Sequence, residues 1–324
     1  MVGTTWMAEF AAAGGLRPVP EDLVDPDAFF PGNQRTTEYL DASYGVPWYA
    51  DARILIYRAD LAEEAGVEAP ATWEDYDAFN EALADIGVDY GTYLQSGGDG
   101  TTNMFLPFVW QAGGAVMNDD ETEFTLDTPE VREALEYYVS LFDRGFTPVE
   151  SQVGLYQTQF LDGTIGSYVS GPYEIAQVRA LAEDAGQDPD EMIGVAPMPA
   201  GEQAGAFVGG ADLGVFTTAK NPDAAWKFIR FLSETGVQQD WYDITTDLPA
   251  VPEAWESGTL AEDELFSSIR ESIEAGTATP QIVTWQQVDD LINREVEKAV
   301  RGVSSVEEAT AAMQQKASLI GTGK

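Results

Sequence analysis

The sequence predicts an α/β fold, because well-capped amphipathic helices alternate along the chain with short β-like runs. The segment 128–145 is typical of the helices: Thr128 can cap it, Pro129 suits the first helical position, and apolar residues fall on one face before Gly145. Further helix starts are predicted after Thr72, at Asn221-Pro222 and at the capping box Ser305 to Glu308. The strand-like runs between the helices are residues 53–57, 165–169, 193–196 and 213–217.

Length and hydropathy predict a folded chain of about two domains. The chain has 324 residues, 44% of them hydrophobic, which is enough for sizeable cores at roughly 100–200 residues per domain. It contains no apolar run of about 18 residues, so we expect no transmembrane helix. Residues 1–5 do not resemble a signal peptide.

Composition excludes much catalytic chemistry. The chain has no cysteine and no histidine, which excludes disulfides, thiolate nucleophiles, the usual zinc sites and a Ser-His-Asp triad. Residues 97–100 lack the lysine of a phosphate-binding loop. Residues 118–121 lack the ligand spacing of an EF-hand and are interpreted as a hairpin turn. We therefore expect neither a cofactor nor a metal.

The charge is strongly unbalanced, with 56 acidic and 16 basic residues and a formal net charge of −40. Nucleic acid is a poor partner, because phosphate backbones are bound by clustered Lys and Arg. A high charge keeps the surface hydrated but causes self-repulsion that salt can screen. Two interpretations stay open: adaptation to a high-salt habitat, and an ordinary acidic exported protein.

Aromatic residues next to Gly, Pro or Asp are the more informative pattern. Trp48-Tyr49, Tyr173, Trp241-Tyr242 and Trp285 fall in predicted loops, where binding groups gather on a rigid scaffold. An aromatic face with a nearby carboxylate suits a sugar, whose C–H face packs on the ring while its hydroxyls form hydrogen bonds. The alternative is that each of these rings simply packs in the core.

The order of motifs along the whole chain resembles one known family. The chain is similar to the extracellular sugar-binding proteins of ABC importers, of the maltose/trehalose-binding type. The motifs that carry this resemblance are residues 3–10 (GTTWMAEF), 44–51 (YGVPWYAD), 56–61 (IYRADL), 73–75 (WED), 110–114 (WQAGG), 170–175 (SGPYEI), 209–214 (GGADLG), 224–229 (AAWKFI) and 248–250 (LPA).

The resemblance implies a two-lobed periplasmic-binding-protein-like fold of type II, with the ligand cleft between the lobes. It assigns residues 1–50 plus 211–252 to an N-terminal lobe and residues 51–210 plus 253–324 to a C-terminal lobe. In the family, strand and helix units precede the segment that Met1 opens here, so we expect the first lobe to be truncated. A start codon assigned too far downstream or a gene fragment would explain this, and a true lobe-truncated protein is the other possibility.

Ligand-binding residues follow from the resemblance one position at a time. Asp51 matches the carboxylate that binds sugar hydroxyls, and Tyr173 matches a stacking aromatic that is commonly Trp. Gly209 and Gly210 line the second crossover. The complete predicted set is Trp48, Tyr49, Asp51, Arg53, Asn103, Tyr173, Gly209, Gly210, Asp212 and Trp285.

The resemblance further implies a non-enzymatic, monomeric, extracellular or periplasmic protein. It would bind a mono- to oligosaccharide, such as a disaccharide α-glucoside, and close around it by a hinge. It would then deliver the sugar to the transmembrane permease subunits of an ABC transporter. Two alternatives stay open: a carbohydrate-active enzyme that uses two of the many carboxylates, and an inactive truncated remnant.

The charge leads to a first prediction. Raising potassium chloride from about 0.1 M to about 2 M shortens the screening length from roughly 10 Å to below 3 Å and weakens repulsion among the acids. The melting temperature, measured by circular dichroism, should rise by several degrees. Chloride is used rather than sulfate, because sulfate strengthens apolar burial in any protein. A melting temperature that does not change would exclude charge repulsion as a limit on stability.

Overall fold

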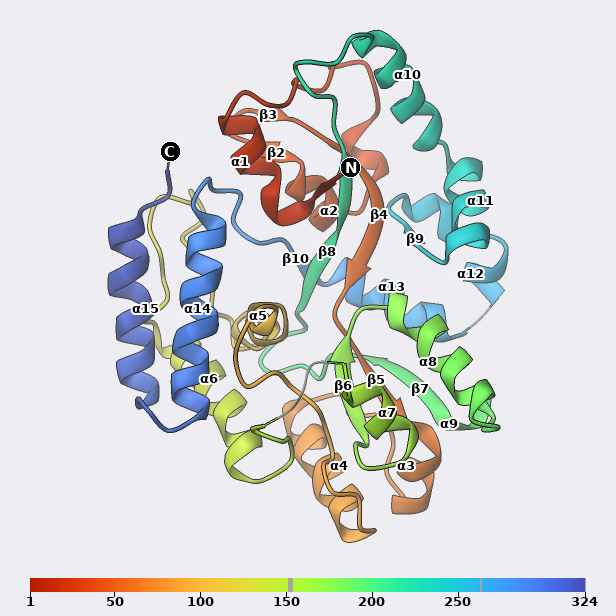
Figure 1. Cartoon of the computed structure of the whole chain (residues 1–324), viewed down its shortest axis with the longest axis vertical. Coiled ribbons are helices and arrows are strands. Elements are labelled where there is room, and N and C mark those ends of the chain that lie inside the picture. Colours follow the sequence, from red (N-terminus) through yellow and green to blue (C-terminus); the bar gives the residue numbers. More distant parts are fainter. Residues whose placement is uncertain (151–153, 263, 324) are drawn as a thin grey trace. The chain divides into compact units, whose positions relative to one another are not determined.

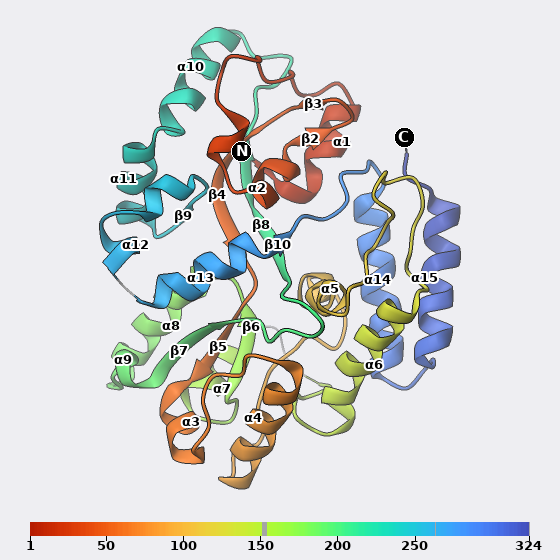
Figure 2. The same cartoon turned by 180° about the vertical axis from the view of Figure 1, so that it is seen from behind.

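The structure is a computed structural model that describes residues 1–150, 154–262 and 264–323. The chain folds as two compact units, each built from helices and a small sheet (Figures 1 and 2). Unit 1 comprises Met1–Ala52, Phe207–Val288 and Ile320–Lys324, and unit 2 comprises Arg53–Ala206 and Asp289–Leu319. The mixed helix and sheet content of both units confirms the predicted α/β class.

The division differs from the expected one chiefly for residues 253–288, which we expected in the C-terminal lobe and which belong to unit 1. Within this segment, strand β10 (Gly276–Thr277) pairs with β8 (Ala206–Leu213), and helix α13 (Glu264–Glu274) packs against β4 (Val46–Ala52). Residues 253–288 belong to unit 1 because they pair with and pack on strands from distant parts of the chain. The local sequence pattern of this segment does not predict such long-range pairing.

Unit 1 is organised around a five-stranded sheet. Its strand order is β1 (Val2–Gly3), β8, β4 and β9 (Leu248–Pro249), and β10 also pairs with β8. A separate two-stranded hairpin joins β2 (Glu38–Tyr39) to β3 (Ala42–Ser43). The helices of the unit are α1 (Met7–Ala12), α2 (Pro31–Thr36), α10 (Pro222–Leu232), α11 (Thr235–Thr245), α12 (Thr259–Glu262) and α13, with 3-10 turns η1 (Thr4–Trp6), η2 (Pro26–Ala28) and η3 (Pro252–Trp255).

Unit 2 is organised around a three-stranded antiparallel sheet in the order β6 (Ser167–Ser170), β5 (Ile54–Arg58) and β7 (Ile193–Pro197). Ile54, Leu55 and Ile56 of the central strand are fully buried. The helices of the unit are α3 (Ala59–Ala65), α4 (Trp73–Asp85), α5 (Thr101–Gln111), α6 (Pro129–Asp143), α7 (Tyr156–Leu161), α8 (Tyr173–Asp184), α9 (Pro189–Met192) and α15 (Val306–Ile320). Helix α14 (Trp285–Val300) starts in unit 1 and continues into unit 2.

The predicted helix starts are confirmed and one predicted strand is wrong. The Thr72 hydroxyl and the Asp75 side chain form a reciprocal capping box, and the Thr128 hydroxyl accepts from the Val131 amide. Residues 118–121 form the predicted turn, flanked by an antiparallel bridge. The segment 213–217 is not a strand, because β8 ends at Leu213 and Phe216 makes only an isolated bridge.

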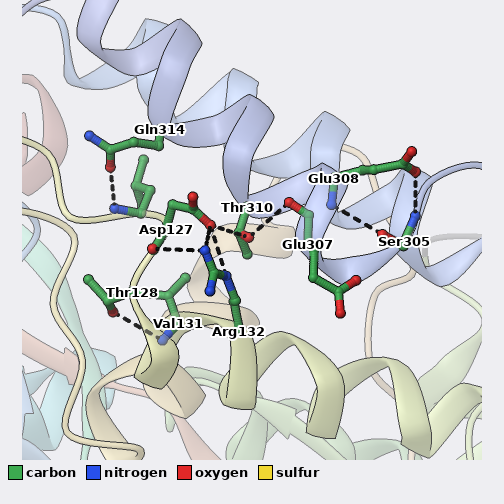
Figure 3. Close-up of polar contacts among 10 residues, drawn as sticks. Asp127, Thr128, Val131, Arg132, Ser305, Glu307, Glu308, Thr310 and Gln314 are labelled. Carbon is green, nitrogen blue, oxygen red and sulfur yellow. Dashed lines mark hydrogen bonds and ion pairs between the residues drawn. The ribbon is translucent and has the colours of Figure 1, made fainter.

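A carboxylate ties α15 to the start of α6 in unit 2 (Figure 3). Asp127 Oδ1 accepts from Thr310 Oγ1 at 2.7 Å, and from Nε and a terminal nitrogen of Arg132 at 3.0 and 2.8 Å. Gln314, one turn further along α15, accepts from the Leu126 amide at 2.7 Å. Although burial raises the pKa of Asp127, the hydrogen bonds from Thr310 and Arg132 outweigh it and lower that pKa. The arrangement therefore favours the ionised carboxylate.

We predict that Asp127→Asn destabilises the fold by about 1–2 kcal/mol at pH 7, because it weakens charge-assisted hydrogen bonds. The folded-state pKa lies below the ordinary value of 3.8, so the wild-type advantage exists at neutral pH. It is lost as the pH falls through the folded-state pKa. Urea unfolding of both proteins between pH 7 and pH 3 measures this convergence.

Glu133→Gln, at an exposed acid of α6, is the control and should change stability by less than about 0.5 kcal/mol. A penalty for Asp127→Asn that stays constant down to the lowest pH would assign the effect to packing instead.

Candidate binding site

Asp51 and Gly209 face each other across the central strands of unit 1. They are register partners in the antiparallel β4–β8 pair, and a Cβ built at Gly209 would lie 3.0 Å from Asp51 Oδ2. The half-buried Asp51 side chain thus lies over a strand that has no side chain at this point. Glycine at position 209 makes room for this carboxylate, and a half-buried carboxylate can accept hydrogen bonds from ligand hydroxyls.

Gly210 has a backbone conformation that favours glycine. Its φ is +110°, and a Cβ there would lie 2.2 Å from the carbonyl oxygen of Tyr49. The register of β4 against β8 also shifts between Pro47 and Tyr49, which marks a bulge next to this glycine. Gly210 is therefore required by the close approach of the strands, whereas a Cβ at Gly209 would press only on the Asp51 side chain and on the Phe207 ring. Tyr49 itself is half-buried beside them.

Asp212 lies on the same strand but is almost inaccessible, with 1% of its surface exposed. Its two carboxylate oxygens each lie 3.3 Å from the Thr36 hydroxyl, and a Cβ added to Gly45 would collide with its side chain. Burial raises the pKa of Asp212 to about 8, against the lowering effects of the Thr36 hydrogen bond and the N-terminal ammonium. This burial argues against the direct sugar contact that we expected of Asp212.

Two of the predicted aromatics are packing residues in this structure. Trp48 is 6% exposed, and its ring lies 5.0 Å from that of Trp241. Trp285, the first residue of α14, is 2% exposed. Neither ring offers a free face large enough for a sugar, because neighbouring side chains already cover it.

Three predicted residues lie in unit 2. Tyr173 begins α8 after the turn Ser170 to Pro172 and is 52% exposed, which leaves its ring open for stacking. Arg53 is half-buried at the entry to β5, and Asn103 is half-buried in the first turn of α5. Each of the three lies on a different element of the unit.

The sequence interpretation missed two polar groups that support these positions. Asn33 of α2 is buried and donates from Nδ2 to the Gly209 carbonyl oxygen at 3.1 Å, which fixes the open backbone beside Asp51. Glu174 follows Tyr173 and is 3% exposed. The sequence does not indicate a role for Asn33, because its hydrogen-bond partner lies 176 residues away. Glu174 lies within the motif 170–175, in which the sequence interpretation considered only Tyr173.

Searches of the described residues found neither a metal site nor a membrane span. In residues 1–150, 154–262 and 264–323, no three acidic side chains are grouped in a way that could hold a metal ion. Within the same residues, no helix combines the length and apolar character needed to cross a membrane.

The profile of the bacterial extracellular solute-binding protein family matches residues 1–239. The chain therefore belongs to this family, whose members bind substrates rather than transform them. A putative binding protein of Brucella abortus (strain 2308) is 27% identical over 320 residues, which cover 93% of this chain and 74% of that protein.

Two further relatives carry more specific names. A maltotriose-binding protein of Pyrococcus abyssi (strain GE5 / Orsay) is 30% identical over 241 residues, 70% of this chain and 49% of that protein. The solved structure of the sugar-binding protein MalE from Xanthomonas citri superposes with a TM-score of 0.88 at 29% identity, covering 98% of this chain and 82% of that one. These likenesses confirm the two-lobed binding-protein class predicted for the fold.

The geometry at Gly210 yields a prediction for unit 1. Gly210→Ala should destabilise the protein by at least about 2 kcal/mol, because the methyl group collides with backbone and the φ of +110° strains any other residue. Gly236→Ala in α11 is the matched control: no atom lies within 4 Å of its added Cβ and its backbone is helical, so we expect no loss of stability and a gain of up to about 1 kcal/mol. Guanidinium unfolding measures both, and equal stability of the two variants would contradict the close approach.

Proposed function

We propose that this chain binds a sugar of the maltooligosaccharide class outside the cytoplasm and delivers it to the permease subunits of an ABC importer. Membership of the extracellular solute-binding family supports a binding role. The Pyrococcus relative is a maltotriose-binding protein and the Xanthomonas relative is a sugar-binding protein, which supports a sugar ligand and, from the first of them, an α-glucan. Within this class, a disaccharide α-glucoside is our first candidate, and the protein would act as a monomer.

The observation that carries the proposal is the half-buried Asp51 carboxylate, which lies over its strand partner Gly209. A sugar ring carries neighbouring hydroxyls, and one carboxylate accepts hydrogen bonds from two of them. The missing Cβ at Gly209 leaves room for the Asp51 carboxylate itself, and the half-buried Asp51 keeps part of its surface for ligand hydroxyls. Asn33 holds the Gly209 carbonyl in place, so this surface is rigid before any ligand binds.

Tyr173 of unit 2 is proposed as the stacking residue. Its half-exposed ring at the start of α8 can pack against the C–H face of a pyranose. Tyr49, Arg53 and Asn103, all half-buried, are proposed as further contacts with ligand hydroxyls. Trp48, Asp212 and Trp285 are proposed to stabilise the fold of unit 1 rather than to touch the sugar, because less than a tenth of each is exposed.

We predict that Asp51→Asn and Tyr173→Ala each raise the dissociation constant for the bound sugar more than tenfold without unfolding the chain. The first removes a charged acceptor and the second removes the stacking face, and each loss is of the order of 1.4 kcal/mol or more. Isothermal titration with maltose, maltotriose and maltotetraose measures the effect, with cellobiose as a β-linked comparison and melting curves as a check of folding.

Phe228→Ala is the control, because this exposed aromatic of α10 takes no part in the proposed contacts. It should leave the affinity unchanged. Wild-type protein that melts cooperatively yet binds none of these sugars would contradict the proposal and favour the remnant alternative. Sugar recovered as shorter products would instead favour the enzyme alternative.

A further inference from the structure

We propose that Glu174 is a positioning residue that fixes the ring of Tyr156 as a second aromatic contact for the sugar, next to Tyr173. The inference rests on the proposed function, because it names a further part of the ligand site in unit 2. Neither Tyr156 nor Glu174 was among the residues predicted from the sequence.

Glu174 is a buried carboxylate with several hydrogen-bond partners. Its Oε1 accepts from the Tyr156 hydroxyl at 2.5 Å and from the Ser170 hydroxyl at 2.7 Å, and its Oε2 accepts from Gln157 Nε2 at 3.4 Å. No Lys or Arg is among these partners. Burying a carboxylate that is 3% exposed and bound only to neutral donors costs free energy. The burial of Glu174 at this position therefore needs an explanation.

Tyr156 is held between this carboxylate and a layer of aromatic rings. Its ring stacks on that of the buried Tyr93, with centroids 4.7 Å apart and planes 8° apart. The Tyr168 ring lies 5.2 Å away at 57°. Tyr156 itself remains half-exposed. Stacking fixes the plane of the ring and the bond to Glu174 fixes its rotation within that plane.

Tyr173 is the residue directly before Glu174 and shares the first turn of α8. Burial, the hydrogen bond to Glu174 and the Glu174 charge raise the pKa of Tyr156, and the Tyr173 phenol adds to this in smaller part. Glu174 therefore connects two tyrosines: its backbone is bonded to the exposed Tyr173, and its side chain holds the Tyr156 ring by a hydrogen bond.

The ligand chemistry follows from the direction of the hydrogen bond. The Tyr156 hydroxyl donates its proton to Glu174, so towards a ligand it offers only its lone pairs and the exposed part of its ring. That surface suits a pyranose that donates one hydroxyl and packs C–H groups on the ring. It disfavours a ligand that presents an anionic or acceptor-only group at this point.

The test compares two changes at Glu174. Glu174→Gln keeps an acceptor oxygen for Tyr156 and Ser170, whereas Glu174→Met has a similar size and no acceptor. We expect Glu174→Met and Tyr156→Phe each to raise the maltotriose dissociation constant about tenfold, the loss of one well-made hydrogen bond. Glu174→Gln should rescue binding to within about threefold of wild type.

A double-mutant cycle separates positioning from a general structural role. If Glu174 acts through Tyr156, Glu174→Met should have no further effect on affinity once Tyr156→Phe is present. It should still lower the melting temperature there, because Ser170 and Gln157 lose their acceptor as well. Independent, additive effects on affinity would overturn the proposal.

A second readout needs no ligand. We expect N-acetylimidazole to acetylate the exposed Tyr173 rapidly in wild-type protein and Tyr156 at least fivefold more slowly, as mapped by mass spectrometry of peptides. In Glu174→Met the Tyr156 rate should approach that of Tyr173, and in Glu174→Gln it should stay low. Equal rates in the wild type, or no change in Glu174→Met, would overturn the positioning role.

The two readouts also separate this inference from the proposed function. Wild-type protein that binds no sugar, with Tyr156 protected by Glu174, would refute the sugar site and keep the positioning contact. Wild-type protein that binds maltotriose with an affinity insensitive to Tyr156→Ala would refute the second aromatic contact and keep the proposed function.

Discussion

Strands β4 and β8 approach so closely at Gly210 that a Cβ on this residue would lie 2.2 Å from the Tyr49 carbonyl oxygen. Much of unit 1 follows from this contact. It lets the strands pair from Val46 to Ala52, aligns Asp51 with Gly209 and positions β8 to pair with β1 and β10. The absence of a side chain at the neighbouring Gly209 makes room for the Asp51 carboxylate. The strand pairing and the candidate site therefore both depend on glycine at two neighbouring positions of β8, 209 and 210.

Hydroxyl groups donate hydrogen bonds to buried and partly buried carboxylates in this chain, which has few basic side chains. With 56 acidic and 16 basic residues, most acids have no basic partner to pair with. Asp212 relies on Thr36, Glu174 on Tyr156 and Ser170, and Asp127 uses Thr310 together with Arg132. The result depends on the depth of burial, which is almost complete for Asp212 and only partial for Asp127, and on the number and charge of the donors. Asp127, with a cation, has a lowered pKa, whereas Asp212, with one hydroxyl, has a pKa raised to about 8.

The aromatic residues divide according to what covers them. Trp48 packs against Trp241, and Trp285 is buried at the start of α14, so both contribute apolar burial to unit 1. Tyr173 stays open, and Tyr156 is half-open but fixed by a stacked neighbour and a carboxylate. Stacking on a ligand needs a ring that is both accessible and already oriented, because ordering a free side chain opposes binding. The proposed roles follow this distinction.

The sequence by itself determined the class of fold, the helix starts at Thr72, Thr128 and Ser305, and the family through its motifs. A cap is satisfied within about four residues, so local sequence contains all the information that it needs. Only the tertiary structure decided which aromatics are covered, that residues 253–288 belong to unit 1, and that Asn33 and Glu174 support the site. Burial and hydrogen-bond partners depend on groups far apart along the chain, as in the Asn33 to Gly209 contact across 176 residues.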